Sequence, residues 1–137
     1  MKKLWTKTNG IVLAILLVGF ILRIHNYTNA PPRGASSDEY TYSFLGISIL
    51  EKGVPTSWSY FPAYSQYAKT QSLTVDHIYF PLVTPYFDHP PLYGVLVGAW
   101  AILHGETTFD RITLGTIRQI PILLGMITSV LVYFLSL

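Results

Sequence analysis

The chain has no cysteine, and charged residues make up only 12% of its 137 positions. The lack of cysteine excludes a disulfide framework and thiol chemistry. The low charge, beside 50% apolar and 15% aromatic residues, is atypical of a soluble domain and favours a membrane protein. A formal net charge of +2 is too small to indicate a nucleic-acid partner. Internal repeats and low-complexity tracts are absent as well.

Three apolar segments are candidate membrane spans. A bilayer core about 30 Å thick needs roughly 20 helical residues, so two of the segments are short and depend on interfacial flanking residues. The prediction is an all-α integral membrane fold with three transmembrane helices and a long extracytoplasmic loop. The spans are predicted over 5–24, 90–105 and 118–137, with the long loop over 25–89 and a short cytoplasmic loop over 106–117.

The placement of basic residues predicts the orientation. Lys2, Lys3 and Lys7 precede the first span, which by the positive-inside rule puts the N-terminus in the cytoplasm. Two crossings later, Arg111 and Arg118 would again be cytoplasmic. The expected localisation is therefore the plasma membrane, as a multi-pass protein.

Two alternatives concern the ends of the chain. The lysine-rich start and short apolar stretch also resemble a cleaved signal peptide. Arg23, His25 and Asn26 follow that stretch where small cleavage-site residues are expected, so a retained anchor is favoured. The third span ends at Leu137 itself, which leads us to expect a fragment of a longer protein.

A helix is predicted inside the long loop, over 37–52. Ser36 and Glu39 form a capping box at its start, and Gly53 follows its end. Tyr40 and Phe44 recur at helical spacing, so we expect an amphipathic helix that lies along the outer membrane surface.

Aromatic residues are dense in the rest of the loop. Nine lie between Trp58 and Phe87. Rings at this density suit the headgroup region of a membrane, and they also form surfaces on which sugar rings stack. Both interpretations stay open.

Two groups of titratable residues are candidates for chemistry. Asp38 and Glu39 in the first turn of a helix can simply stabilise its dipole. Asp88 and His89 before two prolines are, equally, a common helix start. A metal site remains possible, built from Asp76, His77, Asp88 and His89, although their spacing fixes no common face.

The order of these motifs resembles the N-terminal portion of a GT-C membrane glycosyltransferase, of the protein O-mannosyltransferase and aminoarabinose-transferase kind. The resemblance covers the chain from about Arg23 to its end. It is carried by Arg23, Asp38-Glu39-Tyr40, Leu50-Glu51-Lys52-Gly53, His89-Pro90-Pro91-Leu92-Tyr93, His104-Gly105-Glu106, and Arg118-Gln119-Ile120-Pro121 with Gly125.

The resemblance implies transfer of a sugar from a polyprenyl-phosphate donor to an acceptor, of unknown class, on the extracytoplasmic side. Asp38 would be the catalytic base, with Glu39 orienting its surroundings. Substrate-binding roles would fall to His89, Arg33 and Tyr40. Lipid and lipid-linked sugar are the implied partners. No cofactor is required, although some relatives use a divalent cation.

A different class of protein fits the same residues. A small three-span membrane protein without catalysis would use the acids as helix caps and the aromatic residues as interfacial anchors. An inactive, truncated gene product is a variant of that alternative. The two classes differ in what they predict for replacement of Asp38 by Asn, since Asn keeps a good cap but cannot act as a base.

Overall fold

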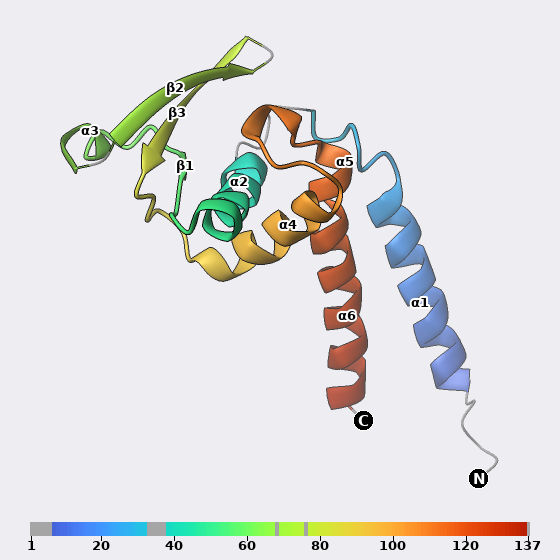
Figure 1. The fold of residues 1–137 in the computed structure, drawn as a ribbon. Coiled ribbons are helices and arrows are strands. Elements are labelled where there is room, and N and C mark those ends of the chain that lie inside the picture. Colours follow the sequence, from blue (N-terminus) through green and yellow to red (C-terminus); the bar gives the residue numbers. More distant parts are fainter. Residues whose placement is uncertain (1–6, 33–37, 68, 76, 137) are drawn as a thin grey trace.

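The computed structural model describes residues 7–32, 38–67, 69–75 and 77–136. The chain is mostly helical and consists of a packed unit, from which two long helices extend side by side (Figure 1). The helices are α1 Lys7–Ile24, α2 Asp38–Lys52, α3 Tyr64–Tyr67, α4 Pro91–Leu103, α5 Leu114–Ile117 and α6 Gln119–Leu135; a 3-10 turn η1 covers Phe109–Arg111; the strands are β1 Ser57–Trp58, β2 Lys69–Val75 and β3 Ile78–Thr84.

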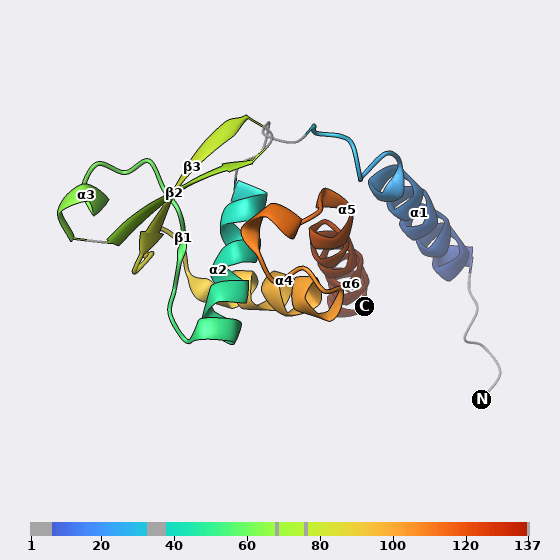
Figure 2. The same ribbon diagram turned by 45° about the horizontal axis from the view of Figure 1, so that its top comes forward.

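The packed unit is built on a close contact between α2 and α4, which lie against each other in both ribbon views (Figures 1 and 2). Three glycines make the contact possible. A Cβ at Gly46 would overlap the carbonyl oxygen of Gly94, and one at Gly98 would overlap the backbone of Gly46 and Ile47. Gly94 and Gly98 form the small-xxx-small spacing that lets helix backbones approach.

Aromatic rings fill the space between α2, β3 and the loop after α4. Phe109 is the centre: its ring lies 5.9 Å from Tyr40, 5.2 Å from Phe44 and 4.9 Å from Phe80, centroid to centroid. All four side chains are buried. The core therefore joins the sheet, the first helix of the loop and the segment before α5 into one body.

The sheet corrects the all-α prediction. β2 and β3 pair antiparallel along their whole length, and β1 adds two residues on the other side of β3. Valine, threonine and aromatic residues favour strands here, but Pro81 hides the signal because proline is rare in central strands. The Pro81 carbonyl accepts a hydrogen bond from the Ser59 N–H, so this edge of Pro81 faces the residue that follows β1. The N–H that proline lacks would face the same residue, where the pairing of β1 with β3 has already ended.

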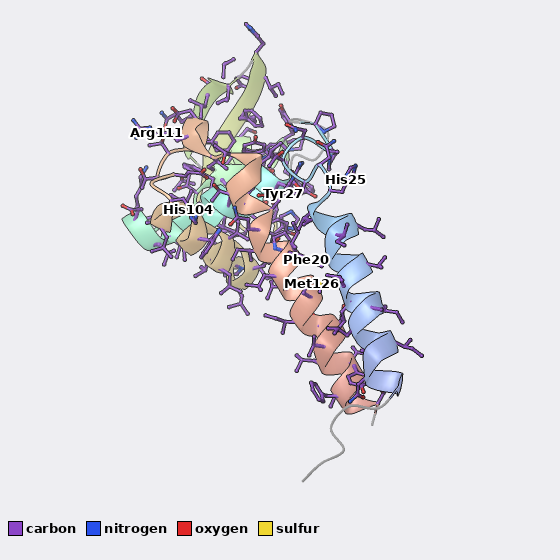
Figure 3. The ribbon with its side chains drawn as sticks, turned by 90° about the vertical axis from the view of Figure 1, so that its right-hand side faces the viewer. Phe20, His25, Tyr27, His104, Arg111 and Met126 are labelled. Carbon is purple, nitrogen blue, oxygen red and sulfur yellow. The ribbon has the colours of Figure 1, made fainter. Side chains whose placement is uncertain are left out.

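The two long helices α1 and α6 run antiparallel, with the first turn of α1 near the last turn of α6 (Figures 1 and 3). The Tyr133 hydroxyl donates to Asn9 Oδ1 at 2.7 Å and ties these ends together. Within the described residues, one helical stretch is long and apolar enough to cross a membrane by length and composition: Leu114–Leu135, which runs through α5 and α6. Asn9–Ile24, in α1, is apolar but shorter. None of the residues of α6 is buried.

The structure does not show the predicted second span as a membrane crossing. α4 has thirteen residues, about 20 Å, and packs on α2. The Arg118 guanidinium, expected on the cytoplasmic side, donates to the carbonyls of Tyr27 and Pro31 at 2.7 Å each. Residues on opposite sides of a bilayer core about 30 Å thick cannot make such contacts. The residues over 106–117 therefore belong to the same end of the molecule as the loop over 25–89, and Arg111 and Arg118 are not separated from it.

The helix expected over 37–52 is α2, but its surroundings differ from the prediction. Residues Tyr40, Thr41 and 43–48 are buried, so the helix is covered on nearly all sides and is not a one-sided surface helix. Its buried serine hydroxyls have partners within the protein: Ser43 donates to the Glu39 carbonyl at 2.8 Å, and Ser48 donates to the Thr56 carbonyl at 2.8 Å. α2 is thus the central helix of the packed unit.

Candidate functional site

Asp38 lies exposed in the first turn of α2 and lines two separate pockets. Tyr42 follows one helical turn later, so it shares the face of Asp38. Of the described residues that line these pockets, Asp38 is the one common to both. The two pockets have different walls, and they are described in turn.

The apolar pocket has a volume of about 210 Å³ and lies between α2, α4 and the start of α6. Tyr93 and Tyr42 close one side, their rings 5.1 Å apart and edge to face. Burial, and then the charge of Glu39, raise the pKa of Tyr93, which keeps its hydroxyl a donor. Its lining is Asp38, Glu39, Tyr42, Tyr93, Val97, Ile117, Arg118 and Pro121.

The aromatic pocket has a volume of about 280 Å³ and lies on the other side of Asp38, beside the short strand β1. Rings and proline form most of its wall, and carboxylates stand at two points of it. Its lining is Asp38, Thr41, Trp58, Ser59, Tyr60, Phe61, Pro62, Tyr86, Asp88 and His89.

Glu39 differs from the exposed Asp38, because its carboxylate is held by Arg118. The guanidinium donates through Nε to Oε1 and through an Nη to Oε2, both at 2.8 Å. The Arg118 side chain is 6% exposed and that of Glu39 is 25% exposed. With its bonds to the Tyr27 and Pro31 carbonyls, Arg118 uses four of its five N–H groups. The pair therefore joins the end of α1, the start of α2 and the start of α6.

Asp88 organises the far wall of the aromatic pocket. Its carboxylate accepts from the Ser59 hydroxyl at 2.6 Å and from the Tyr64 hydroxyl at 2.7 Å. The Tyr64 oxygen in turn accepts from the Phe87 N–H at 2.8 Å. Burial, with Asp88 beside it, raises the pKa of Tyr64 and keeps the phenol protonated. Asp88 therefore does more than precede a helix, because it also holds Ser59 and Tyr64 in the pocket wall.

His89 stands at the entrance of α4 between two tyrosines. Its ring lies 4.9 Å from that of Tyr42 and 6.1 Å from that of Tyr86. Burial, followed by the charge of Asp88, raises the pKa of Tyr86 well above its ordinary value. His89 thus borders the aromatic pocket, as its predicted substrate-binding role requires.

Of the other two predicted substrate-binding residues, one lies in the core and one is outside the described residues. Tyr40 is 2% exposed, packs against Phe80 and Phe109, and lines neither pocket. It is two positions from Asp38, on the other side of the helix, whereas Tyr42 at four positions faces the site. Arg33 lies outside the described residues.

Sequence reasoning missed most of the pocket walls. Tyr42 could have been found from its spacing to Asp38, but Ser59, Tyr64 and Asp88 come together only through the fold.

The described residues gather no group of three or more His, Asp or Glu side chains that could hold a metal ion. His77 precedes β3 and His89 follows it, so the seven residues of the strand, about 23 Å, separate them. The proposed four-residue metal site is therefore not assembled from its described members.

Comparisons with protein-family models, with curated proteins and with solved structures find no match to this chain.

Proposed function

We propose that the chain is the N-terminal portion of a membrane glycosyltransferase that moves a sugar from a polyprenyl-phosphate donor to an acceptor. The observation that carries the proposal is the position of Asp38 in the walls of both pockets. A base for glycosyl transfer must reach the acceptor hydroxyl while the donor sugar lies next to it. A carboxylate between two pockets suits that task.

The two pockets suit different substrates. The apolar pocket adjoins the start of α6 through Ile117 and Pro121, next to the long apolar helices, so it is the side from which a lipid-linked donor would arrive. The aromatic pocket is lined by Trp58 of β1 and the residues that follow it, and β1 lies on the far side of α2 from α1 (Figure 1), so this pocket suits the acceptor. In the reaction, the acceptor oxygen attacks the anomeric carbon and gives its proton to Asp38. The bond to phosphate breaks, and its electron pair leaves with the phosphate.

The membrane arrangement is part of the proposal. We propose that α1 and α6 cross the plasma membrane as a helical hairpin, each about 26 Å long, near the thickness of a bilayer core. No residue of α6 is buried by protein, which favours lipid as its surroundings. With Lys2, Lys3 and Lys7 on the cytoplasmic side, the packed unit and Asp38 are extracytoplasmic.

The leaving phosphate needs a cation or aligned dipoles. Arg118 is the one cation that lines either pocket among the described residues, and four of its five N–H groups are already used. We therefore propose that the phosphate site is completed elsewhere, by Arg33 or by further parts of a complete enzyme. A divalent cation at that site is compatible with the proposal.

The test compares Asp38→Asn with the wild-type chain in membranes. Transfer is followed as release of polyprenyl phosphate from polyprenyl-phosphate mannose and polyprenyl-phosphate glucose. We expect Asp38→Asn to lower the rate by about 100-fold or more, because general base catalysis contributes about 10²–10⁴. The midpoint of thermal unfolding should change little, because Asp38 is exposed and the loss of its charge from the first turn of α2 costs at most about 1 kcal/mol.

Glu51→Gln is the matched control, since Glu51 is an exposed acid on the same helix outside both pockets. Full transfer by Asp38→Asn would leave Asp38 a structural residue of the first turn of α2 and overturn its role as base. Absence of transfer by the wild-type chain on every donor would show that this chain does not complete the site by itself, as the non-catalytic membrane protein also predicts.

A further inference from the structure

The aromatic pocket has the composition of a carbohydrate subsite. Four aromatic residues line it, Trp58, Tyr60, Phe61 and Tyr86, and two carboxylates and a serine lie among them. Trp58 and Tyr60 stand edge to face with centroids 5.3 Å apart, and the Tyr60 hydroxyl is fixed on the Tyr79 carbonyl at 2.6 Å. Such rings present apolar faces, while the polar groups between them fix the orientation of a ligand.

The size of the pocket limits what can enter. About 280 Å³ is just below the usual range of ligand pockets, roughly 300–1,000 Å³, so one ring and its substituents fill it. A chain of several residues or sugars would have to extend into solvent.

The charge of the pocket limits the ligand further. Asp38 and Asp88 both line it, and the described lining contains no lysine or arginine. An ionised carboxylate only accepts hydrogen bonds and offers about four positions, of which Asp88 uses two for Ser59 and Tyr64. The ligand must therefore donate hydrogen bonds, and a negative charge on it would be repelled.

Resting on the proposed function, we infer that the aromatic pocket binds a single sugar ring of the acceptor, one that carries no negative charge. Asp88 accepts hydrogen bonds from its hydroxyls and is the residue that selects against anions. Through Ser59 and Tyr64, the same carboxylate keeps the pocket wall in place. The ring then presents a hydroxyl to Asp38 at the opposite wall.

The experiment measures binding and needs no donor. Saturation-transfer-difference NMR is recorded on the full chain in nanodiscs with three probes of one shape: methyl glucoside, which is neutral, glucosamine, which is cationic, and glucuronate, which is anionic. We expect signals for the neutral and cationic probes and at least a severalfold weaker signal for glucuronate. In the Asp88→Asn variant, the signal of glucuronate should approach that of methyl glucoside.

Phe61→Ala tests the aromatic wall without endangering the fold, because Phe61 is 68% exposed. Binding of methyl glucoside should weaken about twofold to tenfold, the range of one aromatic contact. Phe87→Ala is the matched control: Phe87 is 75% exposed and lies outside the aromatic pocket. Its binding should equal that of the wild-type chain.

Equal binding by Phe61→Ala and the wild-type chain, or preference for glucuronate, would overturn the inference. Displacement of methyl glucoside by farnesyl-phosphate glucose would put the donor's sugar in this pocket and overturn its assignment to the acceptor. Absence of sugar binding by a chain whose transfer depends on Asp38 would overturn this inference alone. Sugar binding with no transfer from any donor would support the pocket and count against the proposed function.

Discussion

The α1–α6 hairpin and the α2–α4 unit are both apolar, but they differ in how much of their apolar surface is covered by protein. α6 has no buried residue, whereas eight of the fifteen residues of α2 are buried. The hairpin is also loosely packed: a groove of about 460 Å³ lies between its helices, lined by Phe20, Tyr27 and Met126 among others (Figure 3). In α2 and α4 the backbones touch through glycine. Protein covers one region, and the proposed lipid would cover the other.

The difference shows why an apolar helix is an ambiguous signal. α4 contains a run of apolar residues much like that of α6, but it presents Gly94 and Gly98 to a partner helix. Hydropathy adds up residues without regard to which face carries them, and only a partner that fits the face turns the segment into a core helix.

The largest expected effect comes from Gly46→Val in the α2–α4 contact. A valine there would overlap the Gly94 carbonyl, so we expect the packed unit to lose about 3 kcal/mol or more of unfolding free energy, or not to fold. The measurement is denaturant unfolding followed by near-ultraviolet circular dichroism. Gly10→Val in the hairpin is the control: a Cβ at Gly10 meets nothing within 4 Å. Equal losses in the two variants would remove the contrast between the regions.

The next effect comes from Arg118→Met, because Arg118 connects the two regions. Breaking a buried ion pair costs about 3–5 kcal/mol, and the partial exposure of Glu39 reduces this to about 2–3 kcal/mol. The measurement is the unfolding free energy together with cross-linking of cysteine pairs introduced into α1 and α6, which the cysteine-free chain makes simple. Arg118→Met combined with Glu39→Leu should recover part of the loss, since no buried charge then lacks a partner. A loss below about 0.5 kcal/mol would show that the Arg118–Glu39 ion pair does not contribute to stability as a buried pair does.

The smallest effect is a dependence on alkaline pH that is confined to the packed unit. The pKa of Tyr64 is raised from 10.0 by burial and by Asp88, so the folded state holds its proton more tightly than the unfolded state. Its contribution is complete below pH 10 and is lost as the pH rises through the raised pKa. Absorbance of tyrosinate and thermal unfolding between neutral pH and pH 11 would measure it.

Tyr64→Phe should flatten that alkaline slope, leaving the part due to Tyr86 and Tyr93, whose pKa values burial also raises. The helix content of the hairpin should not follow the same curve. A slope that is unchanged in Tyr64→Phe would contradict the assignment.

Much of the local structure could be predicted. The helix expected over 37–52 matches α2 at Asp38–Lys52, because capping residues and Gly53 act over a few positions. The sheet could not be predicted, because Pro81 interrupts the pattern of β3 and β1 is only two residues long. The resemblance assigns the base role to Asp38 and an orienting role to Glu39, but the spacing of an adjacent acidic pair does not by itself separate the two. That separation comes from Arg118, 79 positions away.

By itself, the sequence determined which segments are apolar, where α2 begins and ends, and that Asp38 and His89 stand at the starts of helices. Only the tertiary structure decided which apolar helix is covered by protein, which of the two acids is left open, and which aromatic rings form a pocket with Asp88. The reason is physical: capping and periodicity act between near neighbours, whereas burial and ion pairing depend on partners that folding brings together.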